Sequence, residues 1–468
     1  MDIIERMRAI IGDAHVLTGK DCARWAKDWT GKYHGQPLAV LRPASTAEVS
    51  QIMRLATETG ASVVPASGNT GLVGGTHAPG RLVLSVDRMR AIHEIRPGAQ
   101  LAIVDAGVVL ANLHSAVAEH GLVFPVTLGA RGTALIGGIL STNAGGSNVV
   151  RFGNTREQVL GIEVVLPSGE ILNLMSELRK DNSGFDLRDL FIGAEGTLGI
   201  ITAAVLKLRP MPAAYATAMV ALASLDDALD LLNRVQAASG GAVEAFEYMP
   251  GGYIREHLKM RPDARPPFAE IHDVNVMIEI AATAPKDAIP GPDGALPVIQ
   301  TLETLLGEML AEGAVLDATI AQNEAQRAEI WTRREDAGEM SVSRTPAIPM
   351  DVALPLDRLS EFLDRADIAL QAVDPGAERL IVSHLGDGNI HLTIWPTATG
   401  AEQSEMVLER IEDIVADMHG SFSAEHGIGL SKQSAMARRK DPVALDVMRR
   451  IKTALDPDNI MNPGKILP

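Results

Sequence analysis

Cysteine is almost absent from this sequence, and its scarcity excludes several kinds of site. Cys22 is the single cysteine among 468 residues, so internal disulfides, cysteine-bound iron–sulfur clusters and zinc knuckles are excluded. No apolar run approaches the ~20 residues of a membrane-spanning helix. The formal net charge of −17 argues against a nucleic-acid partner, because a phosphate backbone needs a basic surface. We therefore expect a protein of the reducing cytoplasm that has no membrane span.

The first eleven residues alternate charged and apolar side chains at helical spacing. They have neither the long apolar core of a signal peptide nor the scarcity of acids typical of a transit peptide. We therefore expect an N-terminal helix in an unprocessed, soluble chain. The length of 468 residues predicts about two to three domains.

From Pro37 onward, β-favouring runs alternate with a helical pattern. Ser45 and Glu48 form a capping box, which predicts a helix that ends at Gly60. Strands are predicted at residues 38–42, 61–65 and 82–86. This order predicts a layered α+β domain.

Three later segments are rich in glycine and small residues: Pro65–Thr76, Thr133–Gly146 and Asn182–Thr202. Their spacing matches neither a dinucleotide-binding fingerprint nor a P-loop, and a strand rather than a helix follows the first segment. Each segment alone is better explained by close packing of the backbone. Three of them within ~130 residues indicate a large, extended cofactor.

The strand pattern breaks after Leu208, and we place a domain boundary near residue 212. Residues 213–440 predict a second α+β unit, with a strand at residues 275–281 and amphipathic helices at 297–312 and 357–373.

A hairpin is predicted around Asp387 and Gly388, because an Asp-Gly pair between two apolar runs favours a two-residue turn. That turn would place His384 directly opposite His391, with their Cβ atoms about 5 Å apart, on the face that Thr393 shares. Two imidazoles at this spacing suit a divalent transition metal. They suit equally well a pair of polar residues at a domain contact.

Glu425 and His426 are the strongest candidates for completing such a site. The carboxylate of Glu425 would give a His, His, Glu ligand set with open positions for a substrate, and His426 would serve in proton transfer. Alone, Glu-His is a common surface dipeptide, so only the pairing with the hairpin raises its significance.

Together these segments resemble the vanillyl-alcohol oxidase and p-cresol methylhydroxylase superfamily of flavoproteins, in its D-lactate and D-2-hydroxyglutarate dehydrogenase branch. The resemblance extends from about Pro37 to Pro468. It implies an α+β fold with a two-subdomain FAD-binding domain (1–212, including the N-terminal helix) and an α/β cap domain containing an antiparallel sheet (213–440). Residues 441–468 would return to the FAD domain.

The resemblance implies bound FAD and a divalent metal, zinc or manganese. Some members attach FAD through a histidine of the first loop, but Asn69 and Thr70 stand there in this chain, which implies non-covalent FAD. The residues implied to bind FAD are Pro65, Gly68, Asn69, Thr70, Gly71, Leu72, Gly74, Gly75, Ser141, Thr142, Asn143, Gly145, Gly146, Glu195, Gly196, Gly199, Ile200 and Asn462.

The same likeness implies that His384, His391 and Glu425 are the metal ligands and His426 is the catalytic base. A D-2-hydroxy acid would bind the metal through its hydroxyl and carboxylate, which lowers the hydroxyl pKa. His426 would accept the proton while hydride passes to the flavin, giving the 2-oxo acid.

Arg334 matches the arginine that binds the substrate carboxylate in the family, a role that suits a guanidinium. From the residues alone, Arg334 is better explained as a helix-surface arginine paired with Glu335 or Asp336.

Three positions depart from the 2-hydroxyglutarate pattern: Gly338, Pro349 and Thr393 stand where those enzymes have threonine, lysine and asparagine. Loss of the lysine removes a partner for a second carboxylate, so we expect D-lactate or a similar acid as the substrate, with Thr393 helping to select it. D-2-hydroxyglutarate is the alternative substrate. The residues are also compatible with a flavin-binding electron-transfer subunit without substrate turnover, and with an oxidase that reduces oxygen.

The electron acceptor stays open among a quinone, a cytochrome and an electron-transferring flavoprotein. We expect a cytoplasmic homodimer, with peripheral association at a membrane left open.

Overall fold

Two structural units divide the chain in the computed structural model, which describes residues 2–292, 294–398 and 400–468. Unit 1 comprises Met1–Gly145, Gly153–Pro210 and Glu425–Pro468, and unit 2 comprises Gly146–Phe152 and Met211–Ala424. The first boundary lies close to the predicted residue 212. The second follows Ala424, earlier than the predicted residue 440, and unit 2 also takes in a short segment of the predicted FAD domain.

The first sheet of unit 1 has four strands in the order β1-β2-β4-β3, and β2, β4 and β3 run parallel. Ser45 caps α2 by accepting a hydrogen bond from the Glu48 amide, and Gly60 ends that helix with φ 66°. The capping box and the helix end predicted from sequence are therefore confirmed. The elements around this sheet are α1 (Ile3–Ile11), β1 (Val16–Leu17), β2 (Ala39–Leu41), α2 (Thr46–Thr59), β3 (Val63–Ala66) and β4 (Leu82–Ser85).

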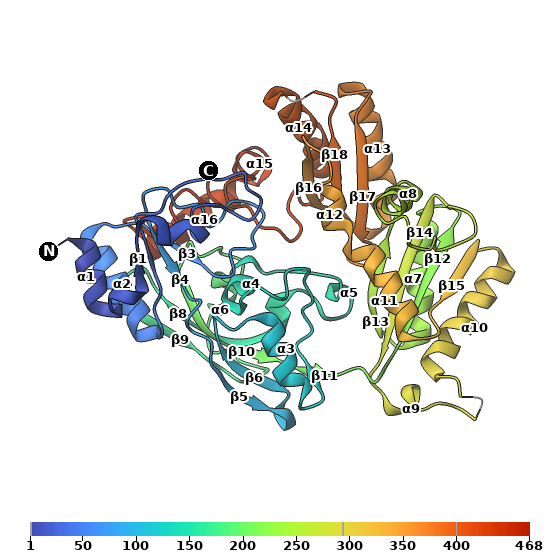
Figure 1. The fold of residues 1–468 in the computed structure, drawn as a ribbon, viewed down its shortest axis with the longest axis horizontal. Coiled ribbons are helices and arrows are strands. Elements are labelled where there is room, and N and C mark those ends of the chain that lie inside the picture. The colour runs from blue at the N-terminus through green and yellow to red at the C-terminus, as the bar shows by residue number, and fades with distance from the viewer. Residues whose placement is uncertain (1, 293, 399) are drawn as a thin grey trace. The chain divides into compact units, whose positions relative to one another are not determined.

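The second sheet of unit 1 is antiparallel, with the order β5-β6-β10-β8-β9. Its strands are β5 (Ile92–Arg96), β6 (Leu101–Asp105), β8 (Val159–Val165), β9 (Ile171–Leu174) and β10 (Ile200–Lys207). The other elements of unit 1 are α3 (Leu110–Ala118), β7 (Leu122–Val123), α4 (Ile136–Thr142), α6 (Arg188–Phe191), β11 (Arg209–Pro210), α15 (Gln433–Arg439) and α16 (Pro442–Leu455). Unit 1 thus has the two α+β subdomains that the sequence predicted (Figure 1).

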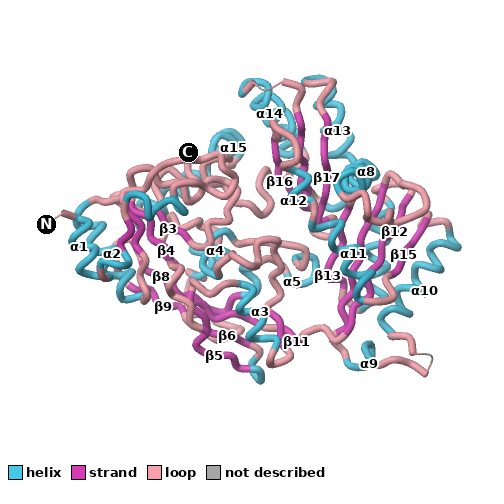
Figure 2. The backbone as a smooth tube through the Cα atoms, viewed as in Figure 1, coloured by secondary structure: helices cyan, strands magenta, loops and turns pink. Residues whose placement is uncertain are grey.

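Unit 2 is built on one antiparallel sheet of seven strands, in the order β15-β12-β14-β13-β17-β18-β16. Figure 2 shows its strands in magenta and the helices that cover it in cyan. The strands are β12 (Ala214–Leu222), β13 (Val243–Tyr248), β14 (Val274–Ala282), β15 (Asp317–Ile320), β16 (Ile348–Ala353), β17 (Glu378–His384) and β18 (Asn389–Trp395). The helices are α5 (Val149–Phe152), α7 (Asp227–Ser239), α8 (Gly251–Met260), α9 (Pro285–Ala288), α10 (Pro297–Glu312), α11 (Glu324–Glu335), α12 (Ala337–Ser341), α13 (Leu359–Val373) and α14 (Ala401–Asp417).

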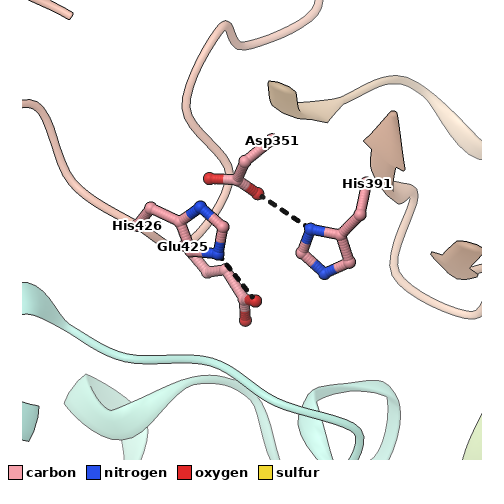
Figure 3. Close-up of side chains that lie close together, drawn as sticks. All are labelled: Asp351, His391, Glu425 and His426. Atoms are coloured by element: carbon pink, nitrogen blue, oxygen red, sulfur yellow. Dashed lines mark ion pairs between the residues drawn. The ribbon is translucent and has the colours of Figure 1, made fainter. Parts of the chain in front are cut away.

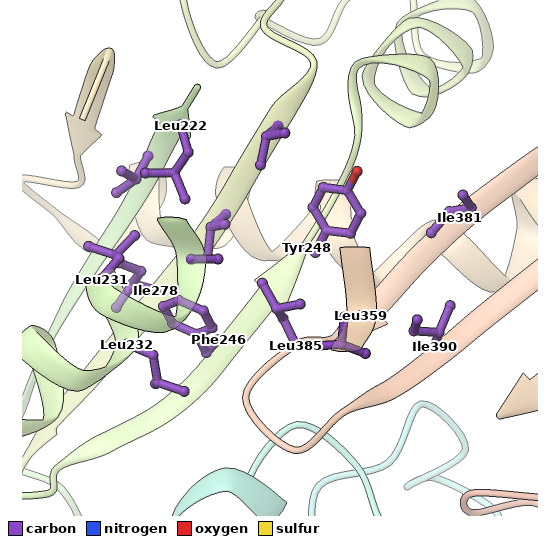
Figure 4. Packing of buried hydrophobic residues seen from close by; sticks show 14 of the residues in the cluster. Leu222, Leu231, Leu232, Phe246, Tyr248, Ile278, Leu359, Ile381, Leu385 and Ile390 are labelled. Atoms are coloured by element: carbon purple, nitrogen blue, oxygen red, sulfur yellow. The ribbon is translucent and has the colours of Figure 1, made fainter. Parts of the chain in front are cut away.

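The two faces of this sheet are buried differently. Helices α7, α10, α13 and α14 cover one face with a large apolar core, in which Phe246, Ile278 and Ile390 are almost fully buried (Figure 4). On the opposite face, α8, α11 and α12 cover a smaller apolar cluster. Alternate residues of each strand point to opposite faces, so each face can carry its own set of side chains. The second face carries polar side chains beside its apolar cluster.

The hairpin of β17 and β18 does not have the predicted register. His384 pairs with Asn389 and His391 pairs with Val382, so the two histidines are diagonal neighbours on one face. The prediction that they stand directly opposite each other was wrong, because residues 385–388 form a four-residue connection. Within this connection the side chain of Asp387 accepts a hydrogen bond from the amide of Asn389.

Among the described helices, none is both long and apolar enough to cross a membrane.

Candidate active site

The three glycine-rich segments converge within unit 1. The first leaves β3 as a loop, the second forms α4 and the turn after it, and the third is the turn that leads into β10. A Cβ on Gly68 would overlap with the carbonyl oxygen of Thr133, so the first two segments touch through their backbones. The amide of Glu195 donates to the carbonyl of Ser141 at 2.8 Å, which joins the second segment to the third.

Asn462 joins the first and third segments from the C-terminal end of the chain. Its Nδ2 donates to the carbonyl oxygens of Gly75 at 3.2 Å and Glu195 at 2.8 Å. Asn69 ties the first loop to an earlier segment, because its Nδ2 donates to the carbonyls of Arg24 and Lys27. The three segments predicted to bind one extended cofactor are thus joined to one another by backbone contacts and by Asn462.

These contacts place the residues predicted to bind FAD. Pro65 lies in β3, and Ile200 begins β10. Gly146 is the one member of the set that is assigned to unit 2. Asn462 lies in the C-terminal part of unit 1, and the others lie in its converging segments: Gly68, Asn69, Thr70, Gly71, Leu72, Gly74, Gly75, Ser141, Thr142, Asn143, Gly145, Glu195, Gly196 and Gly199.

Glu195 has a second structural role that the sequence did not indicate. Its carboxylate accepts the amides of Ile428 at 2.7 Å and Gly429 at 2.8 Å, just after His426 in the chain. Burial raises the pKa of Glu195, and the two amides act against that rise. Glu195 therefore holds the turn that follows His426.

A second group of polar residues surrounds the point where the chain leaves unit 2. The possible ligand atoms of Asp351, His391, Glu425 and His426 all lie within 4.8 Å of one another (Figure 3). His391 Nδ1 lies 3.8 Å from Asp351 Oδ1, and His426 Nε2 lies 3.6 Å from Glu425 Oε1. Two carboxylates and two imidazoles make a donor set that suits zinc or manganese.

The segment before Glu425 explains this arrangement. Ser421 pairs with Ala353 of β16, and the amide of Ala424 donates to Asp351 Oδ2 at 3.2 Å. Glu425 is the next residue of the chain. Strand-like pairing within unit 2 therefore carries Glu425 and His426 toward Asp351.

His384 lies on the same face of the sheet but has a different set of neighbours. Its Nδ1 lies 2.9 Å from Glu247 Oε1, and its ring stands edge-on to that of His391 with centroids 5.3 Å apart. Nε of Arg334 donates to Glu247 Oε2 at 2.6 Å, and Nη2 lies 3.3 Å from His384 Nε2. His384 is outside the four-residue cluster, and Arg334 is held by Glu247 rather than by Glu335 or Asp336.

Glu247 is the centre of this second arrangement. It is fully buried, and burial alone would raise its pKa, but His384 and Arg334 lower the pKa below its ordinary value. Its carboxylate therefore stays ionised inside the protein. This charge orients both the histidine and the guanidinium.

Asp351 and Glu247 were not predicted from sequence. Asp351 is the one acid in the otherwise apolar run Ile348–Ala353, and Glu247 shares the run Val243–Tyr248 with a second acid, Glu244. A buried carboxylate requires a partner, so an acid inside an apolar run is the signal that could have identified them. The sheet aligns them with the histidines: Glu247 pairs with His384, and Asp351 pairs with His391.

The three specificity positions lie in unit 2. Pro349 is exposed and pairs with the buried Thr393 across β16 and β18, so both share the face of His391. Gly338 lies in α12, where a Cβ would meet no other atom within 4 Å.

Known proteins resemble the chain along most of its length. Residues 37–175 match an FAD binding domain, and residues 211–466 match the C-terminal domain of FAD linked oxidases. A D-2-hydroxyglutarate dehydrogenase of Xanthomonas citri pv. viticola is 36% identical over 95% of this chain and 92% of its own length. A D-2-hydroxyglutarate–pyruvate transhydrogenase of Saccharomyces cerevisiae is 31% identical over 98% of this chain and 93% of its own.

The fold agrees with these matches. The crystal structure of p-cresol methylhydroxylase with bound substrate superposes with a TM-score of 0.74, covering 99% of this chain and 96% of that one at 16% identity. The C-terminal match alone takes in more than half of the 468 residues. The chain therefore belongs to the FAD-linked oxidases, the flavoproteins with the fold of vanillyl-alcohol oxidase and p-cresol methylhydroxylase.

Proposed function

We propose that this protein oxidises a D-2-hydroxy acid to the corresponding 2-oxo acid, using non-covalent FAD and a divalent metal. The observation that carries the proposal is the polar row Glu247, His384, His391 and Asp351, which crosses four neighbouring strands on one sheet face. Relatives named as D-2-hydroxyglutarate dehydrogenases, at 32–36% identity, support the reaction class.

The residues fit the cofactors that the proposal requires. His391 and Glu425 of the four-residue cluster would hold zinc or manganese together with His384, whose ring stands beside that of His391, and Asp351 would be a further carboxylate. The metal would act as a Lewis acid, and FAD would accept the hydride. The converging backbone segments of unit 1 would hold FAD, and Asn69 and Thr70 offer it no histidine for covalent attachment.

The remaining roles belong to side chains. Arg334 would bind the substrate carboxylate, because Glu247 fixes its guanidinium from one side. His426 would accept the proton of the substrate hydroxyl, since its imidazole lies among the same donor groups. The turn held by Glu195 would keep the backbone after His426 in place.

Two substrates are favoured by different observations. Full-length similarity to D-2-hydroxyglutarate dehydrogenases favours D-2-hydroxyglutarate. Pro349, beside Thr393, favours D-lactate or a similar acid, because proline provides no positive charge at this position to bind a second carboxylate. Electrons would leave to a quinone, a cytochrome or an electron-transferring flavoprotein, and the protein would act as a cytoplasmic homodimer.

Anaerobic flavin reduction tests the proposal directly. The purified protein, loaded with FAD, is mixed with D- and L-lactate and with D- and L-2-hydroxyglutarate, and flavin bleaching is recorded with and without a chelator. We expect rapid bleaching by one D-acid, little by the L-acids, and loss of the rapid phase after chelation followed by its return with zinc or manganese.

Competing functions would give different results in the same experiment. A flavin-binding electron-transfer subunit would show no bleaching by any acid, and an oxidase would release hydrogen peroxide during aerobic turnover. Unchanged bleaching after complete metal removal would contradict the role of the metal while leaving the oxidation of the acid intact.

A further inference from the structure

A cavity of about 430 Å³ lies in unit 2 between α11 and the turn that follows α8. Its lining includes His257, Met260, Pro262, Ala264 and Arg333, and none of these belongs to the polar row of the candidate active site. Its volume falls within the range of about 300–1,000 Å³ typical of small-molecule pockets.

Arg333 is the unusual residue of this cavity. It is 2% exposed, and its one hydrogen bond goes from Nη2 to the carbonyl oxygen of Arg265 at 2.7 Å. Nε has no partner, and no carboxylate within the described ranges 2–292, 294–398 and 400–468 forms an ion pair with this guanidinium. A buried cation without an anion is costly, because burial removes its hydration.

His257 adds a second buried polar group to the lining. It is 2% exposed; its Nε2 lies 3.2 Å from Asp336 Oδ2, and its Nδ1 has no hydrogen-bond partner in the described part of the chain. Burial lowers the pKa of His257, and the charge of Arg333 lowers it further, so the ring is neutral at neutral pH. His257 can thus donate or accept a hydrogen bond without adding charge.

The acids near the cavity limit the charge of a ligand. Asp336 is occupied by a bidentate pair with Arg261, at 3.0 and 3.1 Å. Asp263 and Glu329 also line the cavity and would repel a doubly charged anion. Met260, Pro262 and Ala264 give it an apolar wall, so a singly charged anion with a short aliphatic chain fits best.

We propose that this cavity is a second ligand site, which binds a short-chain monocarboxylate through Arg333 and His257. The carboxylate would supply the anion that Arg333 lacks, and the aliphatic chain would lie against Met260 and Pro262. The proposal concerns binding alone and does not depend on the proposed function. The site is separate from Arg334, whose guanidinium is directed to Glu247.

Calorimetric titration of the FAD-loaded protein with butyrate tests this site, with 1-butanol as the neutral probe of similar shape. We expect butyrate to bind and 1-butanol to bind at least about tenfold more weakly, because a hydrogen-bonded charge contributes most of the affinity. Arg333→Gln should weaken butyrate binding by at least tenfold. Arg265→Gln, which removes an exposed charge nearby, should leave it unchanged.

Three more variants separate loss of the site from misfolding and from binding at the candidate active site. Ala264→Phe fills the cavity without removing a charge and should abolish binding, while Glu329→Gln removes a competing acid and should strengthen it. Arg334→Gln should retain binding. Equal affinity for 1-butanol, binding unaffected by both Arg333→Gln and Ala264→Phe, or binding lost only in Arg334→Gln would overturn the proposal.

Discussion

The two candidate binding surfaces of this protein are built from different parts of the polypeptide. In unit 1, three segments meet through backbone groups, and the side chains of Asn69 and Asn462 are used to hold loops together. In unit 2, a sheet face carries buried charges, with Glu247 fixing His384 and Arg334. A binding surface made of closely packed backbone should be disrupted by added side-chain atoms. A surface made of buried charges should be disrupted when one member of an ion pair is removed.

Loss of His426 should have the largest effect on turnover. His426→Ala removes the proposed proton acceptor, so kcat should fall by about 10²–10⁴-fold, the usual contribution of a general base. Flavin content should stay unchanged, because the backbone surface of unit 1 is not altered. Anaerobic flavin reduction measures the rate, and the absorbance of bound flavin measures the content.

His120→Ala is the matched control, because His120 is exposed and belongs to none of the groups described above. If the two variants reduce flavin at the same rate, the proposed role of His426 is contradicted. If His426→Ala loses its bound flavin, the two binding surfaces do not act independently.

Glu247→Gln should have the largest effect on stability. It leaves the guanidinium of Arg334 without its buried anion, and breaking such a pair costs about 3–5 kcal/mol. KM for the substrate should rise at the same time, since Arg334 loses its orientation. Chemical denaturation measures the free energy of unfolding, and steady-state kinetics measures KM.

Glu279→Gln separates stability from function. Glu279 is a buried acid on the same face, paired with Arg327 at 2.7 Å and with Trp331. We expect a similar loss of stability there with an unchanged KM. If KM rises equally in both variants, the effect of Glu247 is not specific to Arg334.

The pH dependence of unfolding tests the same carboxylate. Because the folded-state pKa of Glu247 is lowered, its ionised form stabilises the protein above the unfolded pKa of about 4.3. That contribution is lost as pH falls through the lower, folded-state pKa. The unfolding free energy should therefore fall less steeply in acid for Glu247→Gln than for the unsubstituted protein.

Gly68→Ala tests the backbone surface of unit 1. The new methyl group would overlap with the carbonyl oxygen of Thr133, so we expect a loss of about 1–3 kcal/mol in stability and a lower flavin content. Gly98→Ala is the control in unit 1, because Gly98 lies outside the segments implied to bind FAD and its Cβ would meet no atom within 4 Å. Thermal unfolding and flavin absorbance of both variants decide whether the close approach matters.

The sequence predicted features that depend on neighbouring residues better than features that depend on how strands pair. The helix from Ser45 to Gly60 was predicted because caps act within one turn, and glycine spacing marked the three converging segments. The register of β17 and β18 was missed because the connection has four residues, 385–388, rather than the two that the Asp-Gly pair predicted. Asp351 and Glu247 were missed because strand order, which no local pattern encodes, places them beside the histidines.

The smallest predicted effect is a change in substrate preference on substitution of Pro349. This substitution tests whether the charged row of unit 2 extends along β16 to position 349. Pro349→Lys adds a cation to the exposed end of β16, on the face of Thr393 and His391. A lysine that meets a second carboxylate would contribute about 1.4 kcal/mol, which corresponds to a tenfold change. We therefore expect the ratio of kcat/KM for D-2-hydroxyglutarate to that for D-lactate to rise about tenfold. Pro349→Met, which removes the ring without adding charge, should leave the ratio unchanged. Equal ratios in the two variants would show that position 349 does not contact the distal group, and the preference for a smaller acid would then have to come from Thr393.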